Sequence, residues 1–384
     1  MTNLNEKKSF KEILIGRINW KIALIVVVLI CMMGLFNILS DGIFLSQRNI
    51  SQLLKQSAIL GIVSSGMVLL IVARQIDLSA GASVYLVSVV VAQMTVVYEF
   101  GLFLSIIVAL IVGILLGAFQ GALVAKFNIP AFIVTLAGML IFRGIGYVWT
   151  NAATVGPVPT NVIFISEGYL SKTLSTLIIS ILFLVFVSYA YINAKKLKQW
   201  VNFKEGFWLK FILIALISAI SYFVFLGYQG IPMAVIVVAI GVIIVHFIMS
   251  NTTFGRNIYV IGGNPDAARL AGVQVGKHLF GGFVIMGAIY GIAGILIAAR
   301  LGSAAPTAGN LLELEAIAAA VIGGTSFSGG VGVIPGALIG ALLLSAIDNF
   351  MSIMNVSSFI QQVVKGLILL IAVWFDISIR KKQS

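Results

Sequence analysis

The sequence predicts an all-α polytopic membrane protein with about 10–12 transmembrane helices. Of the 384 residues, 60% are hydrophobic and only 9% are charged, and the mean hydropathy is +1.14. Long apolar segments recur along the chain, and Lys and Arg residues gather between them. This combination is typical of a chain that lies mostly in lipid.

Twelve apolar segments are candidates for crossing the bilayer. We expect spans at 20–39, 51–72, 78–98, 102–125, 131–150, 173–193, 210–228, 231–250, 279–299, 310–330, 335–354 and 357–376. The segment at 310–330 contains Glu313 and Glu315, so we expect a short or broken helix there. The first segment is long for a signal-peptide core and is expected to remain as a membrane helix. Together the spans form one transmembrane domain, 20–376.

The basic residues predict the orientation of the chain. The formal net charge is +12, and most of it lies in short polar stretches. Basic loops stay in the cytoplasm, which places there the N-terminal segment 1–19, the stretch Lys195 to Lys210, the polar segment Phe254–His278 and the tail 377–384. This distribution explains the positive charge without a nucleic-acid partner. The single cysteine, Cys31, excludes a disulfide within the chain, and two distant histidines do not argue for a metal centre.

A glycine motif occurs in two distant parts of the chain. Gly113-Ile-Leu-Leu-Gly117-Ala118 leads to Asn128-Ile-Pro-Ala-Phe132-Ile133, and Gly336-Ala-Leu-Ile-Gly340-Ala341 leads to Asn355-Val-Ser-Ser-Phe359-Ile360. In the expected topology the two copies run in opposite directions through the membrane. We therefore expect an inverted internal repeat, with broken helices near a central pathway.

The polar segment Phe254–His278 contains one expected short helix, Pro265 to Ala271, of roughly 10 Å. Asn264 suits the N-cap and Pro265 the first helical position, and Gly272 suits a left-handed residue after the helix. Such a short helix is marginal alone in water, so it should rest on another surface. That surface is either the membrane domain of this chain or a cytoplasmic partner.

Polar residues also interrupt the apolar segments at two places. Asp77 either caps the following helix or pairs with Arg74. The second interruption ends in the glycine-rich run 323–330, which lacks the Gly-Lys-Ser/Thr ending of a nucleotide site. Lys365 lies inside the last span, and we expect it to pair with Asp348; a role in a translocation path is the alternative.

Several ordered motifs resemble one family of membrane proteins. They are Ile76-Asp77-Leu78-Ser79; Pro130-x-Phe132-Ile133-x-Thr135-Leu136; Gly255-Arg256-x-x-Tyr259-x-Ile261-Gly262-Gly263-Asn264-x-x-Ala267-Ala268-Arg269-Leu270-x-Gly272; Ala305-Pro306-Thr307-Ala308-Gly309; Glu313-Leu314-x-Ala316-Ile317-Ala318; Gly323-Gly324-Thr325-Ser326; and Val364-Lys365-Gly366. The set resembles the permease subunits of ATP-binding-cassette importers for monosaccharides, the ribose, xylose and galactoside class. The extra helix pair near 194–230 looks most like the xylose branch.

The resemblance implies a transport subunit of the bacterial plasma membrane that is not itself an enzyme and carries no cofactor. Its implied partners are a second copy of itself, a cytoplasmic ATPase that binds ATP and magnesium, and an extracytoplasmic sugar-binding protein. The loop that would couple to the ATPase consists of Gly263, Asn264, Pro265, Asp266, Ala267, Ala268, Arg269, Leu270 and Gly272. The candidate translocation path consists of Asp77, Ser79, Phe132, Thr135, Glu313, Glu315, Thr325 and Ser326.

Three other classes fit parts of the sequence. An ion-coupled secondary carrier would also explain an inverted repeat, but it needs a buried ionisable relay, for which only Lys365, Asp348, Glu313 and Glu315 are available. A membrane enzyme would need catalytic carboxylates or basic clusters at the membrane surface, and no such group stands out. Composition alone also allows a membrane scaffold.

Overall fold

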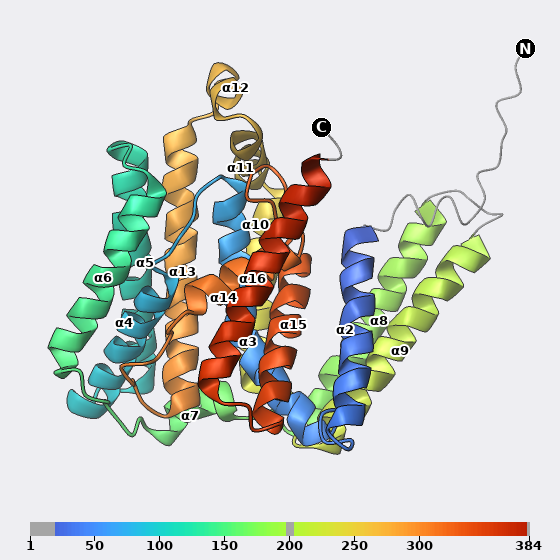
Figure 1. Ribbon diagram of the computed structural model, residues 1–384. Helices are drawn as coiled ribbons and strands as arrows, with labels where there is room; N and C mark the ends of the chain where they lie inside the picture. The colour runs from blue at the N-terminus through green and yellow to red at the C-terminus, as the bar shows by residue number, and fades with distance from the viewer. Residues whose placement is uncertain (1–19, 197–202, 382–384) are drawn as a thin grey trace, which may run out of the picture.

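The computed structural model describes residues 20–196 and 203–381; the remaining residues, among them the expected N-terminal segment 1–19 and the last residues of the tail, lie outside the described ranges. Within them the fold is a helical bundle (Figure 1). The helices are α2 (Trp20–Leu39), α3 (Gln47–Val72), α4 (Ala80–Ala92), the π-helical turn η1 (Gln93–Val97), α5 (Leu102–Lys126), α6 (Ala131–Thr150), α7 (Thr160–Glu167), α8 (Lys172–Lys196), α9 (Phe203–Gly227), α10 (Met233–Asn251), α11 (Thr253–Gly263), α12 (Pro265–Leu270), α13 (Val275–Leu301), α14 (Leu312–Ile322), α15 (Ile334–Ile353) and α16 (Ser358–Lys381).

The long helices run between two ends of the bundle. Figure 1 shows α11 and α12 at one end, here called the α12 end, and α7 at the opposite end, the α7 end. Nine helices in the described part of the chain are long and apolar enough to cross a membrane, and α2 and α16 contribute shorter apolar stretches. The expected all-α polytopic fold is confirmed, and the helix bounds follow the expected spans closely.

Two of the expected spans begin at mid-height after non-helical chain: α4, which continues into η1 and ends at Val97, and α14, a half-length helix of 11 residues. Residues 73–79 follow α3, and Figure 1 shows them running from the α12 end to the start of α4 at mid-height. Residues 302–311 follow α13 and lead from the α7 end to α14, which also begins at mid-height. We call these segments the first break and the second break. The short helix expected within 310–330 is confirmed as α14.

The two breaks occupy equivalent places in an inverted repeat. The first unit consists of α3, the first break with α4, α5 and α6; the second consists of α13, the second break with α14, α15 and α16. The paired elements run in opposite directions between the two ends (Figure 1). This arrangement confirms the repeat that the glycine motifs of 113–133 and 336–360 predict.

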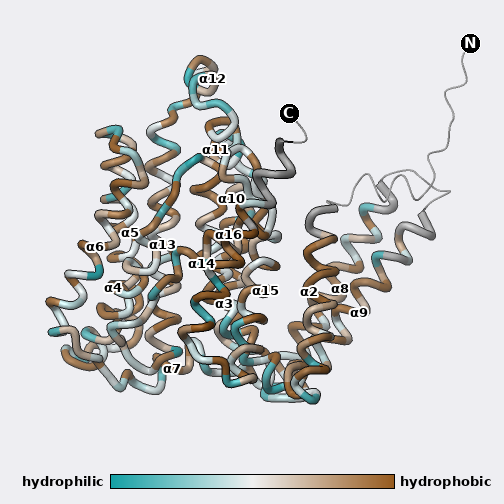
Figure 2. Tube along the Cα trace, viewed as in Figure 1, coloured by the Kyte–Doolittle hydropathy of each residue, from teal (hydrophilic) through white to brown (hydrophobic). Residues whose placement is uncertain are grey.

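The remaining helices lie outside this repeat. Helices α8 and α9 pack on each other as a hairpin. Helix α2 packs on α15, where the rings of Phe36 and Phe350 stack with their centroids 4.0 Å apart. Hydrophobic residues cover much of α2, α8 and α9, whereas hydrophilic residues gather around α12 (Figure 2). Only α9 lies within 194–230, where the sequence suggested an extra helix pair; its partner α8 lies almost entirely before that range and matches the span expected at 173–193.

Glycines bring α5 and α13 into close contact at the centre of the bundle. A Cβ added to Gly113 would lie 2.6 Å from the Gly287 carbonyl oxygen, and one added to Gly117 would lie 2.7 Å from the Gly287 Cα. Glycines at four-residue spacing therefore let the two backbones touch, which is how membrane helices associate without a hydrophobic driving force between them.

One helix of the polar segment was missing from the sequence-based expectation, which contained only the short helix at Pro265 to Ala271. Residues Thr253–Gly263 form α11, whose N-cap Thr252 accepts a hydrogen bond from the Gly255 amide. Three glycines and four β-branched residues lower its intrinsic helix propensity. Burial of Ile258 and Ile261 against the bundle stabilises it instead.

Gly117→Ala is expected to destabilise the protein by about 1–3 kcal/mol, because the new methyl group would overlap backbone atoms of α13. Thermal unfolding of the purified protein in detergent measures the change. Gly144→Ala is the matched control: this glycine also lies inside a helix, and nothing lies within 4 Å of its added Cβ. Equal melting temperatures for the two variants would contradict the close contact.

Candidate coupling loop and translocation site

The short helix α12 forms with the caps that the sequence predicts. The Asn264 side-chain oxygen accepts hydrogen bonds from the Asp266 and Ala267 amides, both at 3.1 Å, and Pro265 occupies the first helical position. The helix ends at Leu270, one residue earlier than expected, and Gly272 has the left-handed φ of +82°. These features confirm the capping of the helix.

One face of α12 packs on this chain and the other is free. Ala268 is buried in a small apolar cluster with Ile261 of α11 and Val275 of α13. Leu270 is 91% exposed, and the Arg269–Asp266 pair, at 3.5 Å, is exposed as well. The side chain of Leu270 therefore contacts almost nothing in this subunit.

Helix α11 fixes the base of α12 to both repeat units. Gly262 lies against Val72 of α3 and Gly330 of the glycine-rich loop, and a Cβ at position 262 would overlap the Val72 carbonyl oxygen. The Gly330 amide donates to that same oxygen at 2.9 Å. Three segments far apart in the sequence thus meet at one point, at the α12 end.

Arg74 binds this junction from the first break. Its Nε donates to the Gly262 carbonyl at 2.7 Å, and its Nη2 donates to the Gly263 carbonyl at 2.7 Å. The expectation left open whether Arg74 pairs with Asp77. The structure gives Arg74 these two carbonyls, which directly precede the N-cap of α12, as its partners.

Tyr259 makes the corresponding contact with the second repeat unit. Its hydroxyl donates to the Gly332 carbonyl at 2.8 Å, just before α15 begins. Burial raises the pKa of the Tyr259 hydroxyl above its usual value. The group therefore stays protonated and able to donate at neutral pH.

Asp77 and Ser79 form a buried polar cluster with α5 and α13. The Asp77 Oδ1 accepts from the Ser79 amide at 2.8 Å and from its hydroxyl at 2.7 Å, and Oδ2 accepts from the Tyr290 hydroxyl. The Gln120 amide donates to the Ser79 hydroxyl oxygen at 2.6 Å. Asp77 thus accepts hydrogen bonds from Ser79 at the end of the first break and joins this end to α13 through Tyr290.

Phe132 and Thr135 lie on α6 but face different surroundings. Thr135 is fully buried and its hydroxyl lies 3.2 Å from the Ile76 carbonyl, which it can satisfy as a donor. Phe132 is exposed on the outside of this subunit. Of the two residues, only Thr135 contacts the first break directly.

The two breaks touch at the start of the helices that follow them. Gly81 of α4 lies against the Gly309 carbonyl oxygen and the Glu313 carboxylate, so that any Cβ at position 81 would overlap both. From α6, Arg143 donates to the carbonyls of Pro306 and Ala308 at 3.0 and 3.1 Å. Glu313 therefore lies at this contact, close to the first break.

Thr325 and Ser326 lie at the opposite end of α14. Both are fully buried, and the Ser326 hydroxyl accepts from the Ser328 amide at 3.0 Å within the glycine-rich loop. The Thr325 hydroxyl has no hydrogen-bond partner in the described part of the chain. These two residues therefore lie close to the junction with α11 and away from the contact between the breaks.

Glu315 joins Lys365 and Asp348 in an ion-pair network. The Lys365 Nζ lies 2.6 Å from the Glu315 Oε1 and 2.8 Å from the Asp348 Oδ2. The pair expected between Lys365 and Asp348 is confirmed, and Glu315 is an additional partner. The network links α14, α15 and α16.

A second ion pair was not expected from the sequence. Lys55 of α3 is only 2% exposed; it pairs with Glu167 of α7 and lies 5.1 Å from the centre of the Tyr169 ring. A lysine near a helix end in a membrane protein usually extends to the interface. Its partner comes from more than a hundred residues away along the chain, so sequence spacing gives no signal for it.

Taken together, the inverted repeat, the two breaks and the exposed short helix α12 are the features of a membrane permease. The family model described as the permease component of branched-chain amino acid transport systems matches residues 49–373. The chain therefore belongs to this permease family.

Its relatives include named sugar permeases. The xylose transport system permease protein XylH of Haemophilus influenzae is 40% identical over 95% of this chain and 98% of its own length. XylH of Escherichia coli is 40% identical over 96% of this chain and 94% of its own. The ribose import permease protein RbsC of Bacillus subtilis is 35% identical over 89% and 87%, respectively. No solved structure matches the chain.

Lys365→Met is expected to lower the free energy of unfolding by about 2–3 kcal/mol, because it leaves Glu315 and Asp348 without a counter-charge. This is less than the roughly 3–5 kcal/mol for fully buried pairs, since these side chains are partly exposed. Unfolding of the purified protein in detergent measures the loss.

The matched control adds Glu315→Gln and Asp348→Asn to Lys365→Met, which makes the whole network neutral. This triple variant should recover most of the lost stability, because no uncompensated charge remains. A triple variant less stable than Lys365→Met alone would contradict this account.

Proposed function

We propose that this chain is the transmembrane subunit of an ATP-binding-cassette importer for a monosaccharide, and that the sugar is a pentose, D-xylose. The observation that carries the proposal is α12, a capped helix whose Leu270 projects away from its own subunit. An exposed leucine on such a short helix suits a cytoplasmic partner. The names of the xylose and ribose permeases supply the class of substrate.

The proposed assembly contains two copies of this chain, an ATPase at the α12 end and a sugar-binding protein at the α7 end. The α12 end and both chain termini then face the cytoplasm of a bacterial cell. ATP and magnesium bind to the ATPase. Two equivalent aromatic residues of the repeat, Phe132 on α6 and Phe359 on α16, are exposed on this subunit and are available to line an interface with the second copy.

The proposed path for the sugar follows the breaks, where Asp77, Ser79, Thr135, Glu313 and Glu315 supply polar groups. Thr325 and Ser326 belong to the loop through which the second break meets α11. Polar side chains and carbonyls at broken helices are where transporters place their substrates. Of the residues along the breaks, Ser79 and Thr135 suit a neutral sugar best, because such a ligand cannot compensate a fixed charge.

Uptake of labelled D-xylose into vesicles that contain this chain, its ATPase and its binding protein tests the proposal. Uptake should need ATP and all three components. Leu270→Ala should reduce uptake and ATPase association at least about tenfold, as for an interface hot spot of roughly 1.4 kcal/mol or more, without changing the melting temperature of the free subunit.

The matched control is Val148→Ala on α6, which also shortens an apolar side chain, here 82% exposed. It should leave uptake unchanged. Uptake by this chain alone, driven by an ion gradient and unaffected by Leu270→Ala, would overturn the importer proposal in favour of a secondary carrier.

The junction at Gly262 suggests how α12 acts on the path. If ATPase closure moves α12, the hydrogen bonds of Arg74 carry the movement into the first break, and the Gly262–Gly330 and Tyr259–Gly332 contacts carry it into the second unit. Packed elements that move as rigid bodies transmit such displacements. Arg74 is therefore a positioning residue that joins the ATPase-facing helix to the first break.

Arg74→Met is expected to uncouple the importer. ATP hydrolysis by the assembled complex should persist, while uptake of D-xylose per ATP hydrolysed falls about tenfold, since two charge-assisted hydrogen bonds are lost. Arg74→Lys, which retains the charge but has a single donor nitrogen in place of two, should give a ratio between those of the unaltered protein and Arg74→Met. Parallel loss of hydrolysis and uptake, with an unchanged ratio, would contradict a coupling role.

A further inference from the structure

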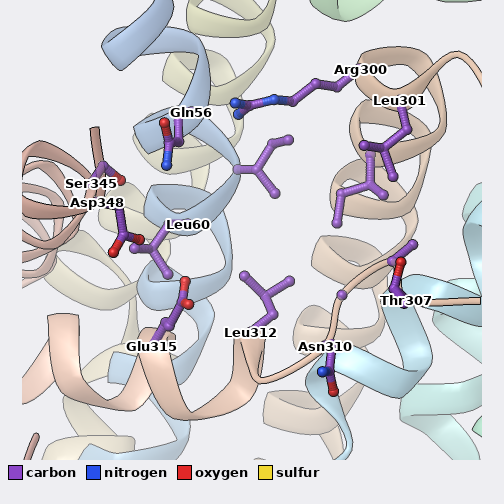
Figure 3. Close-up of a pocket in the computed structure, with 14 residues that line it drawn as sticks. Gln56, Leu60, Arg300, Leu301, Thr307, Asn310, Leu312, Glu315, Ser345 and Asp348 are labelled. Carbon is purple, nitrogen blue, oxygen red and sulfur yellow. The ribbon is translucent and has the colours of Figure 1, made fainter. Parts of the chain in front are cut away.

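A cavity of about 320 Å³ lies beside the second break, between α3, α13, α14 and α15. Figure 3 shows side chains from all four helices around it, with Gln56 on α3, Arg300 on α13 and Asp348 on α15. Thr307 and Asn310 reach it from the break itself. The cavity is thus an open one, lined by elements of both repeat units within a single subunit.

Several polar groups that line this cavity lack partners. Asp348 is 7% exposed, and its Oδ1 atom is buried and accepts no hydrogen bond from any described residue. Among the described residues, the side chains of Gln56, Arg300 and Asn310 also form no ion pair or hydrogen bond. A buried acceptor without a partner is costly, so a ligand that donates hydrogen bonds would be stabilised here.

The charges around the cavity balance. Two carboxylates, Glu315 and Asp348, line it together with the Arg300 guanidinium, and Lys365 of α16 pairs with both carboxylates. The sum of two negative and two positive groups is zero. Because the site has no net charge, an ion would gain little there, whereas a neutral ligand with many hydroxyl groups leaves no charge uncompensated.

The cavity also has an apolar wall. Leu60 and Leu312 face the space between the polar groups, as Figure 3 shows, and Ile59 and Ile297 complete this side. A sugar ring presents C–H groups on its faces and hydroxyl groups around its edge, which matches this mixed lining. The volume lies at the lower end of the roughly 300–1,000 Å³ of small-molecule sites, a size that suits one monosaccharide.

We propose that this cavity is a monosaccharide-binding site within each permease subunit, occupied by the sugar during import. The Asp348 carboxylate and the Gln56 amide hold the hydroxyl groups, and Leu60 and Leu312 contact the ring. The inference rests on the proposed import of a monosaccharide. It adds a site lined by one copy of the chain to a path expected between two copies.

Protection of an introduced cysteine by D-xylose tests this site. In a Cys31→Ser background, Asn310→Cys places the only thiol of the chain in the lining of the cavity, at a position that is exposed. The complex with its ATPase, in lipid nanodiscs and without the binding protein, is treated with a polar thiol reagent. When the D-xylose concentration is twice the dissociation constant of the sugar, about one third of the complexes have an unoccupied cavity. Labelling of the introduced cysteine should therefore slow about threefold.

Matched variants locate the effect. Ser303→Cys, in the same break but outside the cavity lining, should label at the same rate with and without sugar. Gln56→Leu should raise the sugar concentration needed for half-protection about two- to tenfold, as expected for one lost hydrogen bond. Gln52→Leu, on the same helix and outside the lining, should not change it.

The outcomes separate this site from the proposed function. Protection at Asn310→Cys that weakens in Gln56→Leu and not in Gln52→Leu supports the site. A complex that imports D-xylose with ATP but gives no protection overturns the site and leaves the importer proposal standing. A complex that imports no monosaccharide overturns both.

Discussion

The contact between the two breaks is the constraint on which the rest of the structure depends. Non-helical backbone inside a membrane has to find hydrogen-bond partners within the protein, because lipid offers none. The first break obtains them from Asp77 and Thr135, and the second from Arg143 and a short bridge between Ala304 and Val155. Only a residue without a Cβ fits at Gly81, where the breaks meet. The helices of both repeat units are arranged around this point.

The same breaks explain the place of α11 and α12. Each break or its half-helix reaches the α12 end, the first through Arg74 and the second through the glycine-rich loop that follows α14. Helix α11 lies where these ends meet, so a single short element contacts both repeat units. A helix joined to only one unit could move that unit alone. Because α11 contacts both repeat units, the helix α12 that follows it is suited to act on both breaks together.

The sequence predicts the spans and the caps well, because both depend on local patterns. Apolar length gives the long helices, and Asn264, Pro265 and Gly272 give the ends of α12. Contacts between distant segments leave no such pattern. Arg74 binds the Gly262 and Gly263 carbonyls and Lys55 binds Glu167, and neither pairing follows from spacing. Helix α11 was missed for the same reason, since burial against other elements and not propensity stabilises it.

The two breaks differ in a way that separates their roles. In the first, the polar side chains are already satisfied, because Asp77 and Ser79 bind Tyr290 and Gln120. In the second, Arg143 binds main-chain carbonyls, which leaves the side chains of Thr307 and Asn310 free at the cavity. A segment with satisfied side chains suits a fixed frame, whereas one with free polar side chains suits ligand contact. An inverted repeat thus supplies two similar backbones that differ in how far their polar side chains are already paired within the subunit.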